Sequence, residues 1–243
     1  MPFAIGTDGP FVPALIVVDM QEDFCPPGSL AVQEGRDIAP LINCLLSESG
    51  FVTRIATQDY HPSDHISFAS NHPPPNNRPF ESCIEMKNPA PGKEMETRPQ
   101  QLWPVHCVAD SPGAELIPEI RADLIDVVVH KGKHSQVEMY SAFADAFGNS
   151  DPAMAEKSVN MDIAELLRDH KVTDVFVVGL AGDYCVKCTA IDAAKAGFRS
   201  WIVEEATKCV VPTDWEKVKQ EVQAAGVSVI HADDPMIQKL AVR

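Results

Sequence analysis

Short runs of apolar, β-branched residues alternate along this chain with stretches in which the apolar residues fall at helical spacing. Runs of this kind, bounded by turn signals, are typical of strands that are covered on both faces of a parallel sheet. The predicted strands are Ala14–Val18, Phe51–Thr57, Leu124–Val129, Val175–Leu180, Ser200–Val203 and Val227–Ile230. The predicted helices lie near residues 38–45, 163–167, 185–196 and 213–226. Because strands and helices alternate, the pattern predicts an α/β fold with a parallel sheet that has helices on both faces.

One segment, residues 71–101, departs from this alternation. It contains seven of the 20 prolines and shows little apolar periodicity, so we expect a long surface loop within a single domain that spans residues 1–243. Loops of this length inside a compact domain are often functional. The sequence leaves open whether this loop is a tolerated insertion or a lid over a site.

The charge balance narrows the classes of partner. The chain has 20 Lys and Arg against 35 Asp and Glu, a net charge of −15, and 45% of its residues are apolar. The apolar content is that of a folded domain, whereas the acidic charge disfavours nucleic acid and anionic membranes as partners. The sequence shows no secretory signal and no apolar run of membrane-spanning length, and its seven cysteines are scattered. We therefore expect reduced cysteines and a cytoplasmic protein, with a nuclear fraction left open.

Polar side chains follow four of the predicted strands at the point where each strand ends. Asp19 follows the first strand, Asp59 and His61 the second, Lys131 the third and Cys185 the fourth. Each residue alone could be a turn residue or a solvated strand end. However, the carboxyl ends of parallel strands lie at one edge of the sheet, where ligands bind. We therefore expect these side chains to form one site.

The pair Asp59 and His61 indicates a metal site. In extended chain, residues two apart point to the same side, and a carboxylate with an imidazole suits zinc or another borderline divalent ion. His106, in the sequence Trp-Pro-Val-His-Cys, is a third candidate ligand, although spacing alone cannot join it to the other two. A metal-binding module without catalytic activity is an alternative interpretation of these residues.

Cys185 begins a predicted helix, in Gly-Leu-Ala-Gly-Asp-Tyr-Cys. A thiol at a helix N-terminus lies at the positive end of the helix dipole, which favours its thiolate, and the neighbouring N–H groups can bind an oxyanion. The spacing to Cys188 also permits a dithiol redox site or half of a zinc site. Because the chain has no second Cys-x-x-Cys, we favour a single nucleophile at Cys185, with Cys188 packed one turn further along.

Taken together, these motifs resemble the isochorismatase-like cysteine hydrolase family, and in particular its nicotinamidase branch. The matching segments, in family order, are Asp19–Phe24, Thr57–Ala69, Trp103–Cys107, Lys131–Gly132, Tyr140–Phe143 and Gly179–Val186. Within the family, the pairing of Asp-x-His-Pro with Trp-Pro-x-His-Cys is specific to that branch. The long Pro-rich segment is similar to that of the fungal members.

The resemblance implies a three-layer α/β/α fold around a six-stranded parallel sheet, with hydrolysis of nicotinamide to nicotinate and ammonia through a cysteine thioester, as in NAD salvage. It leaves other small amides, such as pyrazinamide, open as substrates, and it leaves open whether the chain forms a homo-oligomer. It implies a catalytic set of Asp19, Lys131 and Cys185, and a divalent metal, usually zinc, held by Asp59, His61 and His106.

The resemblance also implies how the substrate is held. The family has a cis peptide where Leu180 and Ala181 stand here, which would direct the N–H groups of Ala181 and Cys185 toward an oxyanion. The matching pocket aromatics are Phe24, Trp103 and Tyr140. His65 lies outside the implied ligand set, and Glu138 is expected near the waters of the metal.

Overall fold

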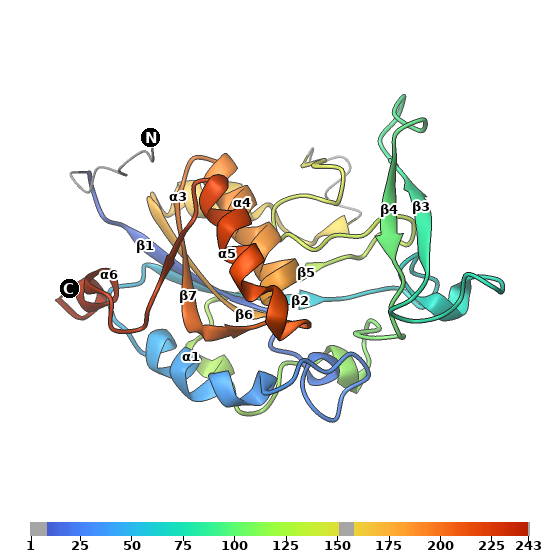
Figure 1. The fold of residues 1–243 in the computed structure, drawn as a ribbon. Coiled ribbons are helices and arrows are strands. Elements are labelled where there is room, and N and C mark those ends of the chain that lie inside the picture. The colour runs from blue at the N-terminus through green and yellow to red at the C-terminus, as the bar shows by residue number, and fades with distance from the viewer. Residues whose placement is uncertain (1–8, 151–157, 243) are drawn as a thin grey trace.

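The computed structural model describes residues 9–150 and 158–242 and places a six-stranded parallel sheet at the centre of the chain (Figure 1). Its strands are β1 (Pro13–Val18), β2 (Thr53–Asp59), β5 (Val127–Lys131), β6 (Asp174–Leu180), β7 (Arg199–Lys208) and β8 (Ser228–Ile230). They lie in the order β5-β2-β1-β6-β7-β8, and every neighbouring pair is parallel. The central strand β1 is buried along its whole length, which explains its unbroken apolar sequence.

Helices cover both faces of this sheet, as the sequence predicted. Helix α1 (Ala39–Leu46) lies on one face, and α3 (Ile163–Asp169), α4 (Lys187–Lys195) and α5 (Trp215–Ala224) lie on the other (Figure 1). Successive residues of β1 serve the two layers in turn, because side chains alternate along a strand. Leu15 packs in the core that contains Ile42 of α1, whereas Ile16 packs in the core that contains Ala190 of α4. A short helix, α6 (Pro235–Gln238), follows the last strand.

Most strand ends differ from the predicted ones by one or two residues, and two differ by more. The strand expected at Leu124 begins at Val127, because residues 122–124 form a short 3-10 turn before it. The strand expected to end at Val203 continues to Lys208. Its polar second half stays in the sheet because it pairs with β6, where Gly179 lies opposite Thr207 after a shift in register. Tertiary pairing thus extends a strand that its own sequence does not mark.

The Pro-rich segment is more ordered than the surface loop that the sequence predicted. It contains β3 (Cys83–Lys87) and β4 (Thr97–Gln101), an antiparallel pair that projects from the side of the molecule (Figure 1). The strands lack an apolar pattern because most of their side chains face solvent, and Met86 and Gln100 alone are buried, at 1% and 2% exposure. Pro99 fits because this isolated pair has free edges, where proline is tolerated.

Candidate active site

The sheet order brings the predicted strand-end residues to one place. Strands β5, β2, β1 and β6 are consecutive neighbours, so the segments that follow them at the carboxyl edge converge. Asp59, the last residue of β2, lies opposite Lys131, the last residue of β5. Asp19 directly follows β1, and Cys185 lies in the π-helical turn Gly182–Val186 that joins β6 to α4. A shared edge therefore collects side chains from four separate parts of the chain.

A fully buried ammonium group lies at the centre of this edge. The Nζ atom of Lys131 is 2.8 Å from Oδ2 of Asp19, 2.5 Å from Oδ1 of Asp59 and 3.5 Å from Sγ of Cys185. The other oxygen of Asp19 accepts a hydrogen bond of 2.6 Å from the Thr57 hydroxyl. All of these side chains are buried. Ions removed from water need partners of opposite charge, and here one cation serves two carboxylates.

The burial also sets the protonation states. Burial raises the pKa of the Cys185 thiol well above its ordinary value, and the opposing effect of Lys131 is smaller. Burial raises the pKa of Asp19 as well, with Lys131 acting against it. For Lys131, burial favours the neutral amine, but the two carboxylates outweigh it and the pKa is raised well above its ordinary value. At rest the site therefore holds an ammonium and a thiol. The thiolate expected from the helix dipole is not favoured, because burial has the larger effect.

Ten side chains line a narrow cavity over the Cys185 sulfur, which we call the reaction cavity. Its volume is about 30 Å³, and the lining residues are Phe24, Leu30, Asp59, Trp103, His106, Tyr140, Ala181, Tyr184, Cys185 and Val210. The three pocket aromatics implied by the resemblance are all among them. The Leu180–Ala181 peptide is cis, as the resemblance implied, and Ala181 lines the cavity beside Cys185. Tyr184, which sequence reasoning did not single out, packs edge-to-face on Trp103 at 5.1 Å between ring centroids.

The three candidate metal ligands also meet at this cavity. Asp59, His61 and His106 each offer one atom, and these atoms lie within 4.8 Å of one another. The Nδ1 atoms of His61 and His106 lie 2.8 Å and 2.7 Å from the carbonyl oxygens of Gly132 and Pro104. A carbonyl can only accept, so each Nδ1 carries the hydrogen and each Nε2 presents a lone pair. Nε2 of His61 is buried without a hydrogen-bond partner in the described structure. These residues fit a divalent metal ion.

The protonation states of these three side chains also suit metal binding. Burial lowers the pKa of His106 to about 4, so its imidazole is neutral and able to bind a metal. Burial would raise the pKa of Asp59, but Lys131 and His61 outweigh it and keep the carboxyl ionised. For His61, burial favours the neutral ring, whereas the nearby Asp59 raises its pKa above the ordinary value. A bound cation would take the place of that proton.

His65 and Glu138 lie beside the three candidate ligands. His65 stacks on His61 with 4.0 Å between ring centroids, but its Nδ1 lies 2.8 Å from the Ser67 hydroxyl and its Nε2 lies 3.2 Å from the Val137 carbonyl. Both ring nitrogens thus have hydrogen-bond partners in the protein, which favours the prediction that His65 is not a ligand. Glu138 is buried and offers an oxygen within 4.8 Å of ligand atoms of both His61 and His65.

Sequence reasoning missed one residue that fixes the geometry of Asp59. The side chain of Gln21 is fully buried, and its amide accepts from the Asp59 N–H at 2.8 Å and donates to the Asp59 carbonyl at 2.9 Å. The second hydrogen of its amide goes to the Ala114 carbonyl at 2.8 Å. Gln21 therefore clamps the backbone that carries a candidate ligand. A polar residue three positions after a buried strand was the available signal.

This chain belongs to the isochorismatase family, because the sequence model of the Isochorismatase domain matches residues 13–234. Among curated relatives, it is 36% identical over 225 residues to the nicotinamidase of Acinetobacter baylyi, covering 92% of this chain and 94% of that protein. Among solved structures, it is similar to the yeast nicotinamidase bound to the inhibitor nicotinaldehyde, with a TM-score of 0.81, 34% identity, and coverage of 90% of this chain and 100% of that chain.

A third similar protein bears on the metal. The pyrazinamidase of Pyrococcus horikoshii, solved in complex with zinc, is 32% identical with a TM-score of 0.67, covering 90% of this chain and 98% of that chain. Together with the cluster of Asp59, His61 and His106, this similarity is consistent with a divalent metal site. In the part of the chain that the structure describes, we find no helix long and apolar enough to span a bilayer.

Proposed function

We infer that this chain is a nicotinamidase, an amidohydrolase that converts nicotinamide to nicotinate and ammonia and so serves NAD salvage. One observation carries this inference. A single narrow cavity is bounded by the thiol of Cys185, by Asp59 and His106 of the candidate metal set, and by aromatic walls. The thiol suits attack on an amide carbon, and the aromatic walls suit a flat ring. Curated relatives that align over nearly the whole chain are nicotinamidases.

In the reaction we propose, Asp19 is the general base. A carboxylate whose pKa is raised by burial is a stronger base than one in water, and Asp19 offers an oxygen within 4.8 Å of Sγ of Cys185. Asp19 takes the thiol proton as the sulfur attacks the amide carbon, and the carbonyl oxygen takes up the negative charge. Asp19 then returns the proton to the nitrogen as the C–N bond breaks, which releases ammonia and leaves a thioester. A water molecule hydrolyses the thioester to nicotinate and restores the thiol.

Lys131, Ala181 and the backbone of Cys185 support these steps in our proposal. The ammonium of Lys131 keeps Asp19 ionised until the thiol proton arrives, since it lies 2.8 Å from the carboxylate. The N–H groups of Ala181 and Cys185 bind the oxyanion, and a donor in such a position typically contributes about 3 kcal/mol to transition-state stability. Phe24, Trp103 and Tyr140 hold the ring of the substrate against the nucleophile.

We propose zinc as the metal, with Asp59, His61 and His106 as its protein ligands. When bound, the ion would bind the ring nitrogen of the substrate as a Lewis acid and so orient the ring. The protein contribution is to present both Nε2 lone pairs and a buried carboxylate at one point. The ligand set of one carboxylate and two imidazoles is typical of zinc.

The remaining proposals concern the whole protein. We propose one hydrolase domain over residues 1–243, a small amide as its partner rather than nucleic acid or membrane, and a cytoplasmic location.

The alternative of a dithiol redox site at Cys185 and Cys188 is disfavoured, because Cys188 does not line the reaction cavity and burial raises its pKa to about 11. All seven cysteines are free thiols in the structure.

The test is ammonia release from nicotinamide, and from pyrazinamide beside it, by the purified metal-loaded protein. We expect release by the wild type, none by Cys185→Ala, and most of the activity in Cys188→Ser. A wild type that releases no ammonia from nicotinamide would overturn the proposed function. Loss of activity in Cys188→Ser would instead support a dithiol mechanism.

A further inference from the structure

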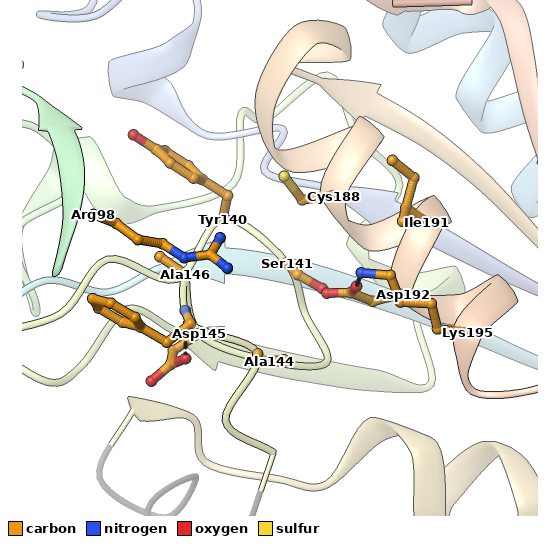
Figure 2. Close-up of a pocket in the computed structure, with 12 residues that line it drawn as sticks. Arg98, Tyr140, Ser141, Ala144, Asp145, Ala146, Cys188, Ile191, Asp192 and Lys195 are labelled. Carbon is orange, nitrogen blue, oxygen red and sulfur yellow. Dashed lines mark hydrogen bonds and ion pairs between the residues drawn. The ribbon is translucent and has the colours of Figure 1, made fainter. Parts of the chain in front are cut away.

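A second, larger cavity lies next to the reaction cavity, and Tyr140 is the one described residue that lines both. The second cavity, which we call the outer cavity, has a volume of about 290 Å³. Its walls come from β4, from residues 140–148 and from α4, and they include Arg98, Asp145 and Cys188 (Figure 2). Cys185 and Cys188 thus line different cavities, with the ring of Tyr140 common to the two.

The Tyr140 ring is held in this position by its hydroxyl group. The hydroxyl accepts a hydrogen bond of 2.9 Å from Nε2 of Gln100 and one of 3.1 Å from Nε1 of Trp103. Figure 2 shows the hydroxyl pointing away from Cys188 and Asp192, toward the side opposite α4. Both lone pairs of the phenol oxygen are therefore used. Two donors on one oxygen fix the direction of the ring more firmly than one would.

Gln100 is itself immobilised, although it belongs to the projecting hairpin. Its side chain is 2% exposed, and the second hydrogen of its amide is donated to the Gln101 carbonyl at 2.7 Å. Most other side chains of β3 and β4 face solvent. The buried amide of Gln100 thus connects the hairpin to Tyr140 in the wall of the reaction cavity.

We propose that Gln100 is a positioning residue that sets substrate size, because it keeps the Tyr140 ring between the two cavities. This proposal rests on the proposed nicotinamidase function. The reaction cavity is small, about 30 Å³, and its walls are aromatic rings that include Tyr140, so a ring substituent needs extra room. That room lies behind Tyr140. With Gln100 in place, ring-substituted amides are rejected, and without it the Tyr140 ring can turn toward the outer cavity and admit them.

The experiment compares steady-state hydrolysis of nicotinamide with that of nicotinamides carrying one methyl group on the ring. The variant is Gln100→Leu, which keeps the bulk of the side chain and removes the donor. The matched control is Gln101→Leu, because Gln101 is the next residue of β4 and donates within the hairpin, to the Ser82 carbonyl at 3.1 Å. Tyr140→Phe and the double variant Gln100→Leu/Tyr140→Phe complete a double-mutant cycle.

We expect Gln100→Leu to raise KM for nicotinamide about fivefold while kcat changes less than about twofold. For at least one methylated amide, kcat/KM relative to nicotinamide should rise about tenfold, the discrimination that one methyl group typically allows. Gln101→Leu should change neither quantity. In the Tyr140→Phe background, Gln100→Leu should add nothing, since the acceptor is already gone. An equal fall in kcat for all amides, or an undiminished effect in that background, would overturn the proposal.

A measurement without substrate separates this proposal from the proposed function. The chain has three tyrosines, so the ring signals of isotope-labelled tyrosine can be assigned by NMR. Gln100→Leu should shift the Tyr140 signals and speed the flipping of its ring, and Gln101→Leu should not. Unchanged Tyr140 signals in Gln100→Leu would overturn the proposed positioning of Tyr140 by Gln100, even if the enzyme is active. A wild type that hydrolyses no nicotinamide would instead overturn the function while the NMR result stands.

Discussion

At the scale of single residues, the ammonium group of Lys131 connects the two halves of the site. It contacts Asp19, the proposed base, and Asp59, a candidate metal ligand, from one buried position. Asp19 has no other cation beside it in the described structure, and Asp59 shares only His61 in addition. Loss of Lys131 would leave buried negative charge poorly compensated, which costs several kcal/mol. The pairing therefore makes the base and the metal ligand depend on the same cation.

Replacing Lys131 should damage stability as well as turnover. In Lys131→Met, two buried carboxylates lose their partner, and we expect the free energy of unfolding to fall by about 3–5 kcal/mol, with ammonia release abolished. Urea unfolding measures the first effect. The control is Lys187→Met, because Lys187 pairs with Glu221 at 2.9 Å in a half-exposed position, where loss of the pair should cost less than about 1 kcal/mol. Equal effects of the two substitutions would contradict the central role of Lys131.

At the scale of elements, the site depends on short connections that follow the strands. The turn after β5 is an example, since Gly132 has a φ of +68° and its carbonyl accepts from His61. A Cβ at this position would lie 2.4 Å from Cε1 of His61. Glycine is needed here both for the left-handed backbone and for the approach of the imidazole.

Gly132→Ala should therefore weaken metal binding more than it weakens the fold. The added methyl pushes the His61 ring away from the other two ligands, and we expect the affinity for zinc to fall about tenfold or more. Competition with a chromophoric chelator measures this. In Gly92→Ala the backbone strain is similar, because φ is +78°, but no atom lies within 4 Å of the added Cβ. If the two variants bound zinc equally well, crowding of His61 would not be the cause.

At the scale of the whole molecule, metal binding should be linked to folding. The three candidate ligands come from β2, from the segment after it and from residue 106, and only the folded chain brings them together. A ligand that binds only the folded state stabilises it, by about 2.7 kcal/mol at a free concentration one hundred times the dissociation constant.

Removal of the metal with a chelator should therefore lower the melting temperature, and added zinc should restore it. In His106→Ala we expect the zinc-dependent increase to disappear. His231→Ala is the control, because His231 is exposed and contacts Glu205 away from the site. Calorimetry over a range of zinc concentrations is the measurement. A zinc-dependent increase of full size in His106→Ala would remove that residue from the ligand set.

The parts of this protein that the sequence predicted well are those in which local pattern and tertiary structure agree. Strands such as β1 and β6 are buried on both faces, so their apolar runs identify them. The hairpin β3–β4 was not predicted, because its exposed side chains remove the apolar signal. The protonation of Cys185 was misjudged for a related reason. Its position at a helix start is visible in the sequence, but its burial is not.

The sequence by itself determined the order of strands and helices and which polar residues end each strand. From that order came the expectation that Asp19, Asp59, Lys131 and Cys185 share one edge, because parallel strands all end on the same side. Spacing could not join His106 to Asp59 and His61, which the family resemblance implied and the folded chain brings together. Tertiary structure alone decided that Gln21 clamps Asp59 and that Gln100 reaches Tyr140. The physical reason is that strand periodicity acts over neighbouring residues, whereas these contacts join segments far apart in the chain and depend on packing in three dimensions.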